Sequence, residues 1–277
     1  MALPDPTADT TVLITGASSG IGEALAREIA SLGHNVSLVA RRRAKLEALA
    51  RDLRAEHDIE VDVHAADVSR DRARSRLLRD VRGGRTVVGL CNNAGIGAFG
   101  HVLGHSVEEE EAMFRTNALA LFDLTNHLVR DMVERGEGAV LNTASILAFA
   151  PIPQNATYAA TKAFIVSYSE ALHTELQGTG VSCTTVNPGP TRTAIFDNSG
   201  AEGAAGFGPG LFWQDAEDVA EAAVAGMLGG SRSVTPGLTN KAAALGLRFS
   251  SRTAMLPITR LVQSAPVRRA LLGGNQV

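Results

Sequence analysis

The chain contains few cysteines and few of the larger aromatic residues. Its 277 residues include two cysteines, one tryptophan and two tyrosines. Two cysteines cannot build the disulfide framework of a small secreted domain. Cys91 and Cys183 fall at the ends of predicted buried strands, where a cysteine usually packs as a small apolar side chain. We therefore expect reduced thiols and a cytoplasmic protein.

Long apolar runs are also missing, so we expect a soluble protein. No stretch reaches the roughly 18 residues that span a bilayer, and the N-terminal MALPDPTADT has no apolar core of the kind found in signal peptides. There is no basic arm and no zinc-finger spacing, so we expect no nucleic-acid partner. His101 and His105 share a helical spacing, but Gly104 lies between them and no acidic third ligand is evident. We therefore expect no metal site.

Acidic residues disappear toward the end of the chain. After Glu221 there is no Asp or Glu, whereas seven Lys and Arg residues follow. Residues 237–277 therefore form a basic extension. It either packs over the substrate entrance or a neighbouring subunit, or it contacts a membrane surface or an acidic carrier.

Short β-branched segments alternate with helical patterns along most of the chain. Strands are predicted at Thr11–Thr15, Asn35–Ala40, EVDVHA, TVVGLC, GAVLNTAS, VSCTTVNPG and SVT near 234, and helices at 23–32, 44–56, 107–135, 155–177 and 217–228. This alternation predicts an α/β fold, a single doubly wound Rossmann-like domain whose parallel sheet of about seven strands has helices on both faces. We place that domain at 11–236, after a flexible N-terminus at 1–10, with a glycine-rich substrate lid at about 194–214.

The segment TGASSGIG joins the first predicted strand to the first helix. Gly16, Gly20 and Gly22 allow a tight turn, and the free amides at a helix start attract an anion. A purely structural turn would have the same composition, but the strand–turn–helix context favours a phosphate site.

The second predicted strand is followed by ARRR rather than by a carboxylate. A site for NAD needs an acid about twenty residues beyond the glycines to bind the ribose hydroxyl. Arg41 instead offers a positive charge to a 2′-phosphate, with the Ser18 hydroxyl as a second ligand. Arg43 is interpreted as a solvated residue of the next helix. The predicted cofactor is NADP(H).

Tyr158 precedes Lys162 by four residues in TYAATKAF, a spacing that places both on one helical face. A nearby cation stabilises a phenolate and lowers the tyrosine pKa toward the range useful for acid–base catalysis. Ser145 lies at the end of the fifth predicted strand, where its hydroxyl either donates to a developing oxyanion or caps the next segment. Tyr168 has no such lysine and is expected to pack.

These motifs, in this order, resemble the short-chain dehydrogenase/reductase family, and the basic extension resembles that of one bacterial subgroup. The resemblance implies a catalytic set of Asn117, Ser145, Tyr158 and Lys162. In it, Lys162 also holds the nicotinamide ribose, and Asn117 holds a water that relays protons to Lys162. The alternative for Asn117 is an exposed helix residue. The cofactor contacts implied by the resemblance and the motifs are Gly16, Ser18, Ser19, Gly20, Ile21, Gly22, Arg41, Asp67, Val68, Asn93, Ala94, Gly95, Tyr158, Lys162, Pro188, Gly189, Thr191 and Thr193.

The segment after Thr193 is rich in glycine and apolar residues. Together with ILAFAPIP, it predicts a pocket for a hydrophobic ketone, aldehyde or alcohol, lined by Phe196, Phe207, Leu211, Phe212 and Trp213. Arg192 could instead hold an anionic group. A 3-oxoacyl thioester reductase and a non-catalytic NADP-binding sensor are the alternative functions. The resemblance also implies a homodimer or homotetramer.

Overall fold

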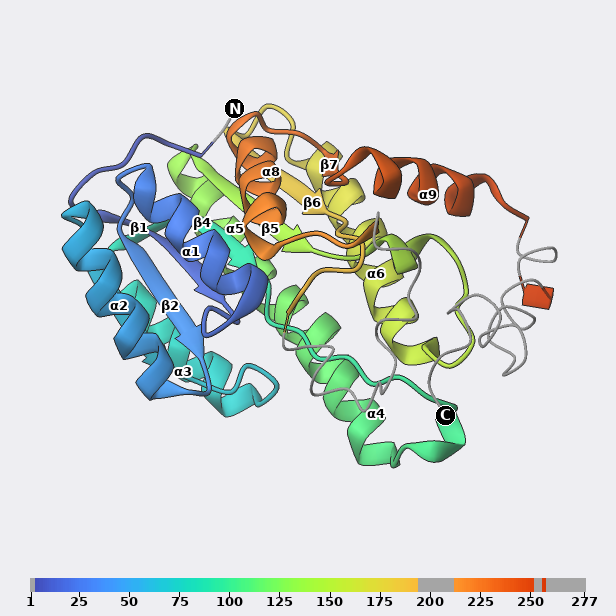
Figure 1. Cartoon of the computed structure of the whole chain (residues 1–277). Helices are drawn as coiled ribbons and strands as arrows, with labels where there is room; N and C mark the ends of the chain where they lie inside the picture. The colour runs from blue at the N-terminus through green and yellow to red at the C-terminus, as the bar shows by residue number, and fades with distance from the viewer. Residues whose placement is uncertain (1–2, 194–211, 252–255, 258–277) are drawn as a thin grey trace.

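The computed structural model describes residues 3–193, 212–251 and 256–257. Within them, parallel strands form a seven-stranded sheet in the order β3-β2-β1-β4-β5-β6-β7, as Figure 1 shows. The strands are β1 (Thr10–Thr15), β2 (Val36–Ala40), β3 (Val61–Ala65), β4 (Thr86–Asn92), β5 (Gly138–Thr143), β6 (Val181–Val186) and β7 (Ser233–Val234). The predicted α/β fold with a single doubly wound parallel sheet is confirmed.

Helices cover both faces of this sheet (Figure 1). Successive strand residues point to opposite faces, so Val12 and Ile14 pack in one core cluster with α1, α2 and α8, whereas Leu13 packs in a second with α3 and α5. The helices are α1 (Gly20–Ser31), α2 (Arg43–His57), α3 (Asp71–Arg82), α4 (Val107–Phe114), α5 (Ala120–Arg135), α6 (Ala156–Glu175), α8 (Ala216–Leu228) and α9 (Leu238–Phe249), with short 3₁₀ turns η1 (Val102–Gly104) and η3 (Ile146–Phe149). No helix in the described ranges is both long and apolar enough to cross a bilayer.

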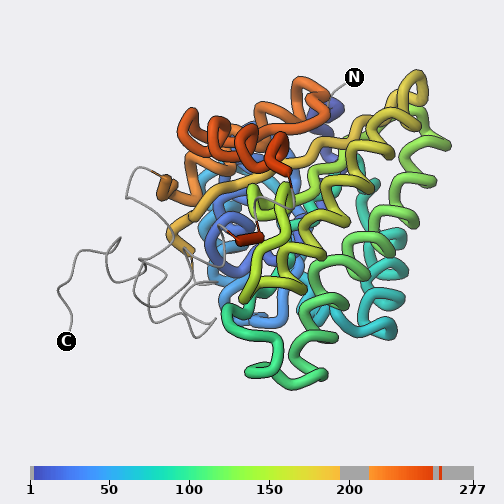
Figure 2. Tube along the Cα trace, turned by 90° about the vertical axis from the view of Figure 1, so that its right-hand side faces the viewer, coloured from blue at the N-terminus to red at the C-terminus, as the bar shows by residue number. Residues whose placement is uncertain are grey.

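The long helix predicted at 107–135 contains an irregular turn. Between α4 and α5, residues Arg115–Leu119 form a single π-helical turn, η2. Such turns occur frequently at functional sites because they redirect a side chain. Beyond η2, α5 runs beside α6, as Figure 2 shows, and the rings of Phe122 and Phe164 lie 6.5 Å apart between centroids.

The N-terminal residues are held against the domain from Leu3 onward, although residues 1–10 are expected to be flexible from the sequence. Leu3 is buried in the core cluster that contains β1. The Asn35 side-chain amide donates to the carbonyls of Thr7, Ala8 and Thr10 at 2.9–3.2 Å. Three hydrogen bonds from one buried amide fix a segment that the sequence pattern marks only as polar.

The start of the basic extension packs against the domain. Helix α9 follows β7, and Arg248 on it lies 3.7 Å from the carboxylate of Glu170 on α6. The same guanidinium lies over the Phe149 ring of η3, 6.0 Å from its centroid. Most of the other tail arginines, Arg252, Arg260, Arg268 and Arg269, lie outside the described residues.

Candidate active site

The glycine-rich turn lies at the carboxyl edge of the sheet between β1 and α1. Gly16 and Gly20 have φ angles of 71° and 58°, which side chains rarely adopt. A Cβ on Gly22 would overlap the Gly16 carbonyl and come within 2.5 Å of the Asn93 side-chain nitrogen. A Cβ on Gly20 would lie 2.9 Å from Thr193. The turn therefore meets the predicted NNAG and NPGPTRT segments, which come from distant parts of the sequence.

The Thr15 hydroxyl fixes the NNAG segment to this turn. It accepts hydrogen bonds from the backbone amides of Asn93 and Ala94, both at 3.0 Å. A Cβ on Gly95 would lie 3.5 Å from Asn117 Oδ1 and 3.7 Å from Lys162 Nζ. The predicted cofactor segment and the predicted catalytic residues are thus neighbours.

Arg42 is the arginine that reaches the glycine-rich turn. Its guanidinium donates to Ser18 Oγ at 2.8 and 3.2 Å, to the Ser18 carbonyl at 3.2 Å and to Ser19 Oγ at 2.8 Å. Arg41, and not Arg42, is the phosphate ligand predicted from the sequence. The ARRR run signals the charge, but it cannot tell which of three successive side chains turns toward the serines.

Arg41 lies on the exposed surface nearer to Asp67. Burial of the Asp67 carboxyl raises its pKa, but hydrogen bonds from Ser69 and the charges of Arg41 and Arg70 outweigh this and lower it overall. The neighbouring Val68 is buried. The predicted adenine-side motif and Arg41 therefore occupy one edge of the site.

Ser145, Tyr158 and Lys162 come together beyond the end of β5. The Ser145 side chain lies close enough to Tyr158 to lower the pKa of the phenol, and the Ser145 hydroxyl accepts a hydrogen bond from the Leu147 amide at 3.2 Å. Both interpretations of Ser145, cap and active-site hydroxyl, thus hold geometrically. Lys162 Nζ donates to the Thr143 carbonyl at 2.8 Å and lies 5.6 Å from the centre of the Tyr158 ring.

The pKa of Tyr158 moves opposite to the expectation. Burial raises it to about 12, although the hydrogen bond with Ser145 lowers it. Burial also lowers the pKa of Lys162 to about 8. Removal of the phenolate from water is therefore the largest effect on the Tyr158 pKa. The Tyr158 side chain is still partly exposed, so it is a protonated phenol that a ligand can reach.

Asn117 lies in the π-helical turn and is 1% exposed, which excludes the alternative of an exposed helix residue. Its Oδ1 accepts from the Ile96 amide at 2.8 Å, and its Nδ2 donates to the Ile96 carbonyl at 2.9 Å and to Thr161 at 3.3 Å. Asn117 therefore fixes the loop after β4 beside the catalytic helix α6.

A residue of the basic extension supports the predicted nicotinamide-side loop. Asn240 on α9 is fully buried, and its Nδ2 donates to the Phe212 carbonyl at 3.1 Å and to Gln214 Oε1 at 2.9 Å. A Cβ on Gly189 would overlap the Asn240 amide, and Thr191 forms a β-bridge with Gln214. Asn240 is not predictable as a site residue from the sequence, because only the fold brings α9 onto the NPGPTRT loop.

Two adjoining cavities lie beside Tyr158. The larger, about 720 Å³, is lined by Tyr158 and by residues of the β4–α4 loop, α4 and the start of α6. The smaller, about 380 Å³, has an apolar lining that includes Phe149, Ile152 and Ala159. Both are lined by Pro153, Ala156 and Leu256. The ILAFAPIP segment therefore does form an apolar wall, as its composition indicates.

Several other predicted residues have definite positions. Phe212 and Trp213 are part-buried, whereas Phe196, Phe207, Leu211 and the rest of the predicted lid at 194–211 lie outside the described residues. Arg192 pairs with Asp215 at 2.8 Å. Tyr168 stacks on Phe164 with ring centroids 5.7 Å apart, a packing role. Among the described residues, no group of three or more His, Cys, Asp and Glu side chains could hold a metal ion.

The residues present fit a dinucleotide. The glycine turn is so tightly enclosed that a Cβ at its glycines would collide with neighbouring atoms, and the NNAG and NPGPTRT segments lie against the turn. The turn leads into the N-terminus of α1, whose free backbone amides can bind a phosphate. With the Ser145, Tyr158 and Lys162 side chains beside it, this fold and site define an NAD(P)-dependent oxidoreductase of alcohol and carbonyl groups. The family model of short chain dehydrogenases matches residues 10–203, and the chain belongs to the short-chain dehydrogenase/reductase family.

Known relatives are similar over most of the described domain. The chain is 34% identical over 182 residues to a 7beta-hydroxysteroid dehydrogenase of Collinsella aerofaciens, covering 65% of this chain and 68% of that protein. It is 35% identical over 181 residues to the ketoacyl reductase HetN of Nostoc sp., covering 65% of this chain and 62% of HetN. A short-chain dehydrogenase from Sphingobium yanoikuyae in complex with NADPH superposes with a TM-score of 0.79 at 32% identity, covering 92% of this chain and 97% of that one.

Proposed function

We propose that the protein is an NADP(H)-dependent oxidoreductase that interconverts a hydrophobic ketone or aldehyde and its alcohol, with Tyr158 as the acid/base. The observation that carries this proposal is the position of Tyr158 in the wall of a cavity of about 720 Å³, with the Lys162 ammonium 5.6 Å from the centre of its ring. A protonated phenol that a ligand can reach is the group that carbonyl reduction needs.

NADP(H) held by the glycine turn and Lys162 would supply the hydride for reduction of the carbonyl carbon. Tyr158 donates its proton to the carbonyl oxygen as negative charge develops there, and the Ser145 hydroxyl donates a hydrogen bond to the same oxygen. Lys162 stabilises the phenolate left on Tyr158 until a proton from solvent restores the phenol. In this proposal Asn117 holds the water of that proton path, as the family resemblance implies.

We place the 2′-phosphate of NADP(H) between Arg41, Arg42 and Ser18. Both guanidiniums lie at the edge formed by the glycine turn and Asp67, and no carboxylate follows β2 in the ARRR run. The NADPH bound to the Sphingobium relative supports the preference. In the same arrangement, Val68 contacts the adenine, and Lys162 contacts the nicotinamide ribose.

The test of the acid/base assignment is Tyr158→Phe. We expect kcat to fall by about 10²–10⁴-fold, because the proton donor is lost, while the affinity for NADPH stays within about twofold. Turnover measured with a panel of bulky ketones and nicotinamide fluorescence titration give the two values. Unchanged turnover in the variant would exclude Tyr158 as the acid/base, whereas a wild type that binds NADPH without turning over any ketone would favour the non-catalytic sensor.

A 3-oxoacyl thioester reductase is the alternative substrate class. The name of the Nostoc relative and the apolar lining of the smaller cavity support it, whereas the Collinsella relative acts on a hydroxysteroid by its name. A screen that includes acyl thioesters, steroid ketones and other bulky ketones with NADPH distinguishes them. Saturation by one class at low concentration decides the substrate.

We also propose a homodimer or homotetramer formed through α5 and α6. Phe122 and Phe164 are exposed there and lie against each other, with Phe114 exposed on α4. We expect sedimentation velocity to give a dimer or tetramer, and Phe122→Ser with Phe164→Ser to give a smaller species. A wild-type monomer at micromolar concentration would contradict the assignment.

A cytoplasmic location, and a membrane or acidic-carrier contact through the tail, stay predictions that fractionation and vesicle binding test.

A further inference from the structure

The larger cavity beside Tyr158 is not uniformly apolar. Glu110 and Met113 of α4 line it on one side, and Asn155 and Tyr158 line it at the start of α6. Asn155 is the residue directly before α6, and Tyr158 lies three residues later in its first turn, so both side chains line the cavity from the same end of the helix. A substrate whose carbonyl meets Tyr158 therefore presents atoms a few bonds away to Asn155 and Glu110.

Two oxygen atoms of this lining are buried without a hydrogen-bond partner in the part of the chain that the structure describes. They are Glu110 Oε2 and Asn155 Oδ1. Asn155 is 4% exposed and precedes α6, yet its side chain makes no capping hydrogen bond. Buried oxygens without partners cost free energy, so such groups usually serve a bound molecule or water.

The neighbours of Glu110 in the acidic run have roles within α4 itself. Glu109 accepts from the Ser106 amide at 2.8 Å and completes the capping box of α4. Glu111 lies 3.5 Å from Arg115, one turn later on the helix. Glu110 differs from both because it is only part-exposed and lines the cavity. Helix capping therefore accounts for an acidic residue at position 109 but not for the glutamate at position 110.

We infer that Glu110 and Asn155 form a polar subsite for a hydrogen-bond donor of the substrate, a hydroxyl or ammonium group a few carbons from the carbonyl. This inference rests on the proposed function, because Tyr158 must hold the carbonyl for the donor to reach the two oxygens. The apolar body of the substrate then occupies the adjoining cavity lined by Phe149, Ile152 and Ala159. The substrate class is thus a hydrophobic hydroxyketone or aminoketone and its reduced form.

The matched probes are 4-phenylcyclohexanone and 4-hydroxy-4-phenylcyclohexanone, which differ by one hydroxyl across the ring from the carbonyl. We expect the wild type, loaded with NADP⁺, to bind the hydroxylated ketone about tenfold more tightly in calorimetric titration, as a hydrogen bond to a charged acceptor allows. With NADPH, the same difference should appear in KM rather than in kcat, because the subsite contacts substrate away from the reacting atoms.

Three variants separate the subsite from a general effect on the fold. Glu110→Ala should abolish the preference between the two ketones, and Glu110→Gln should keep a smaller one because its oxygen still accepts without charge. Glu108→Gln changes an exposed glutamate of the same run and should leave the preference intact. Glu108→Gln should also keep the wild-type kcat for the unsubstituted ketone.

Equal binding of the two ketones by the wild type, or an unchanged preference in Glu110→Ala, overturns the inference. If the proposed function is wrong, the outcome is different. A wild type that turns over no ketone can still bind the hydroxylated ketone more tightly, and the calorimetric titration measures that difference in affinity. The subsite and the catalytic assignment are therefore tested separately.

Discussion

The three successive arginines after β2 give a sharp test of the nucleotide site. Arg42 already donates to Ser18 and Ser19, so its guanidinium is fixed above the glycine turn. Arg41 lies near enough to Asp67 to lower that carboxyl's pKa. Arg43 points elsewhere and pairs with Glu47 at 3.0 Å on the exposed face of α2. Arg41→Ala and Arg42→Ala remove candidate phosphate ligands, and Arg43→Ala is the matched control.

The magnitude follows from the kind of contact. A hydrogen bond between charged groups contributes about 1.5–3 kcal/mol, which corresponds to about 10–150-fold in Kd. Both arginines are exposed, and salt screens exposed charges, so the lower end of this range applies. We expect Arg42→Ala to weaken NADPH binding by about tenfold or more, Arg41→Ala to weaken it less, and neither to change NADH binding by more than about twofold.

Separate fluorescence titrations of NADPH and NADH measure these changes in Kd. At higher salt concentration, the Kd values of the two nucleotides should become more similar. The reasoning is refuted if NADH binds the wild type as tightly as NADPH, or if Arg43→Ala loses as much affinity for NADPH as Arg42→Ala. In the first case, oxidation of an alcohol with NAD becomes the function to test.

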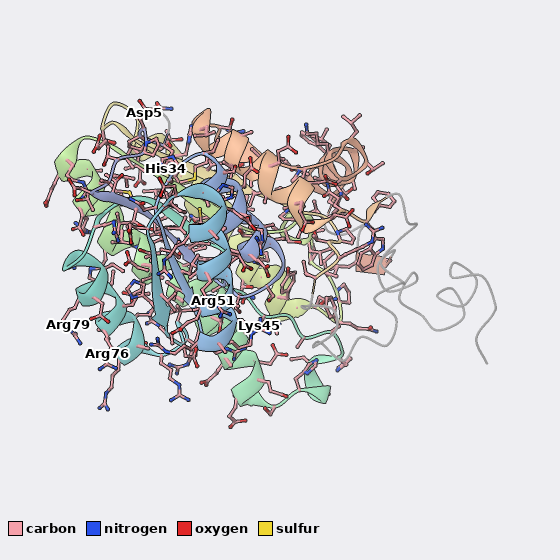
Figure 3. All side chains as sticks on the ribbon, turned by 60° about the vertical axis from the view of Figure 1, so that its left-hand side comes forward. Asp5, His34, Lys45, Arg51, Arg76 and Arg79 are labelled. Atoms are coloured by element: carbon pink, nitrogen blue, oxygen red, sulfur yellow. The ribbon has the colours of Figure 1, made fainter. Side chains whose placement is uncertain are left out.

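Two further predictions concern the stability of the fold. Arg74 is buried and donates to the carboxylates of Asp71 and Asp123, both at 2.6 Å, which joins α3 to α5. Arg74→Ala should lower the free energy of unfolding in urea by about 2–3 kcal/mol, since Asp71 is exposed and Asp123 part-exposed, so both carboxylates stay hydrated. Arg79→Ala, at a side chain that points outward from α3 in Figure 3, should change it by less than about 0.5 kcal/mol. An equal effect of both changes would contradict the ion-pair argument. Burial lowers the pKa of His34, an effect that the nearby Asp5 (Figure 3) partly opposes. Because the unfolded chain then binds more protons than the folded one, the free energy of unfolding should decrease as the pH drops below 6.5, the ordinary histidine pKa. Urea titrations of the wild type and of His34→Asn, above and below pH 6.5, measure how much His34 contributes to this pH dependence. The same pH dependence in both proteins would exclude a contribution from His34.

The sequence by itself determined the order of elements and the chemical types at the site. Alternating β-branched and helical segments define a parallel doubly wound sheet, because parallel strands need helical crossovers. The glycine spacing marks the turn, and the four-residue step from Tyr158 to Lys162 places both on one face of a helix. Each of these features depends only on residues that are close to one another in the sequence, so it can be predicted without knowledge of the fold.

The tertiary structure decided what depends on neighbours in space. It turned Arg42 rather than Arg41 toward the serines, placed Asn117 in a buried π-helical turn, and brought Asn240 against Gly189. It also raised the pKa of Tyr158, where the spacing to Lys162 predicts a lowered one, because the phenol is buried. Side-chain direction, burial and contacts between distant segments are properties of packing, and no spacing along the chain fixes them.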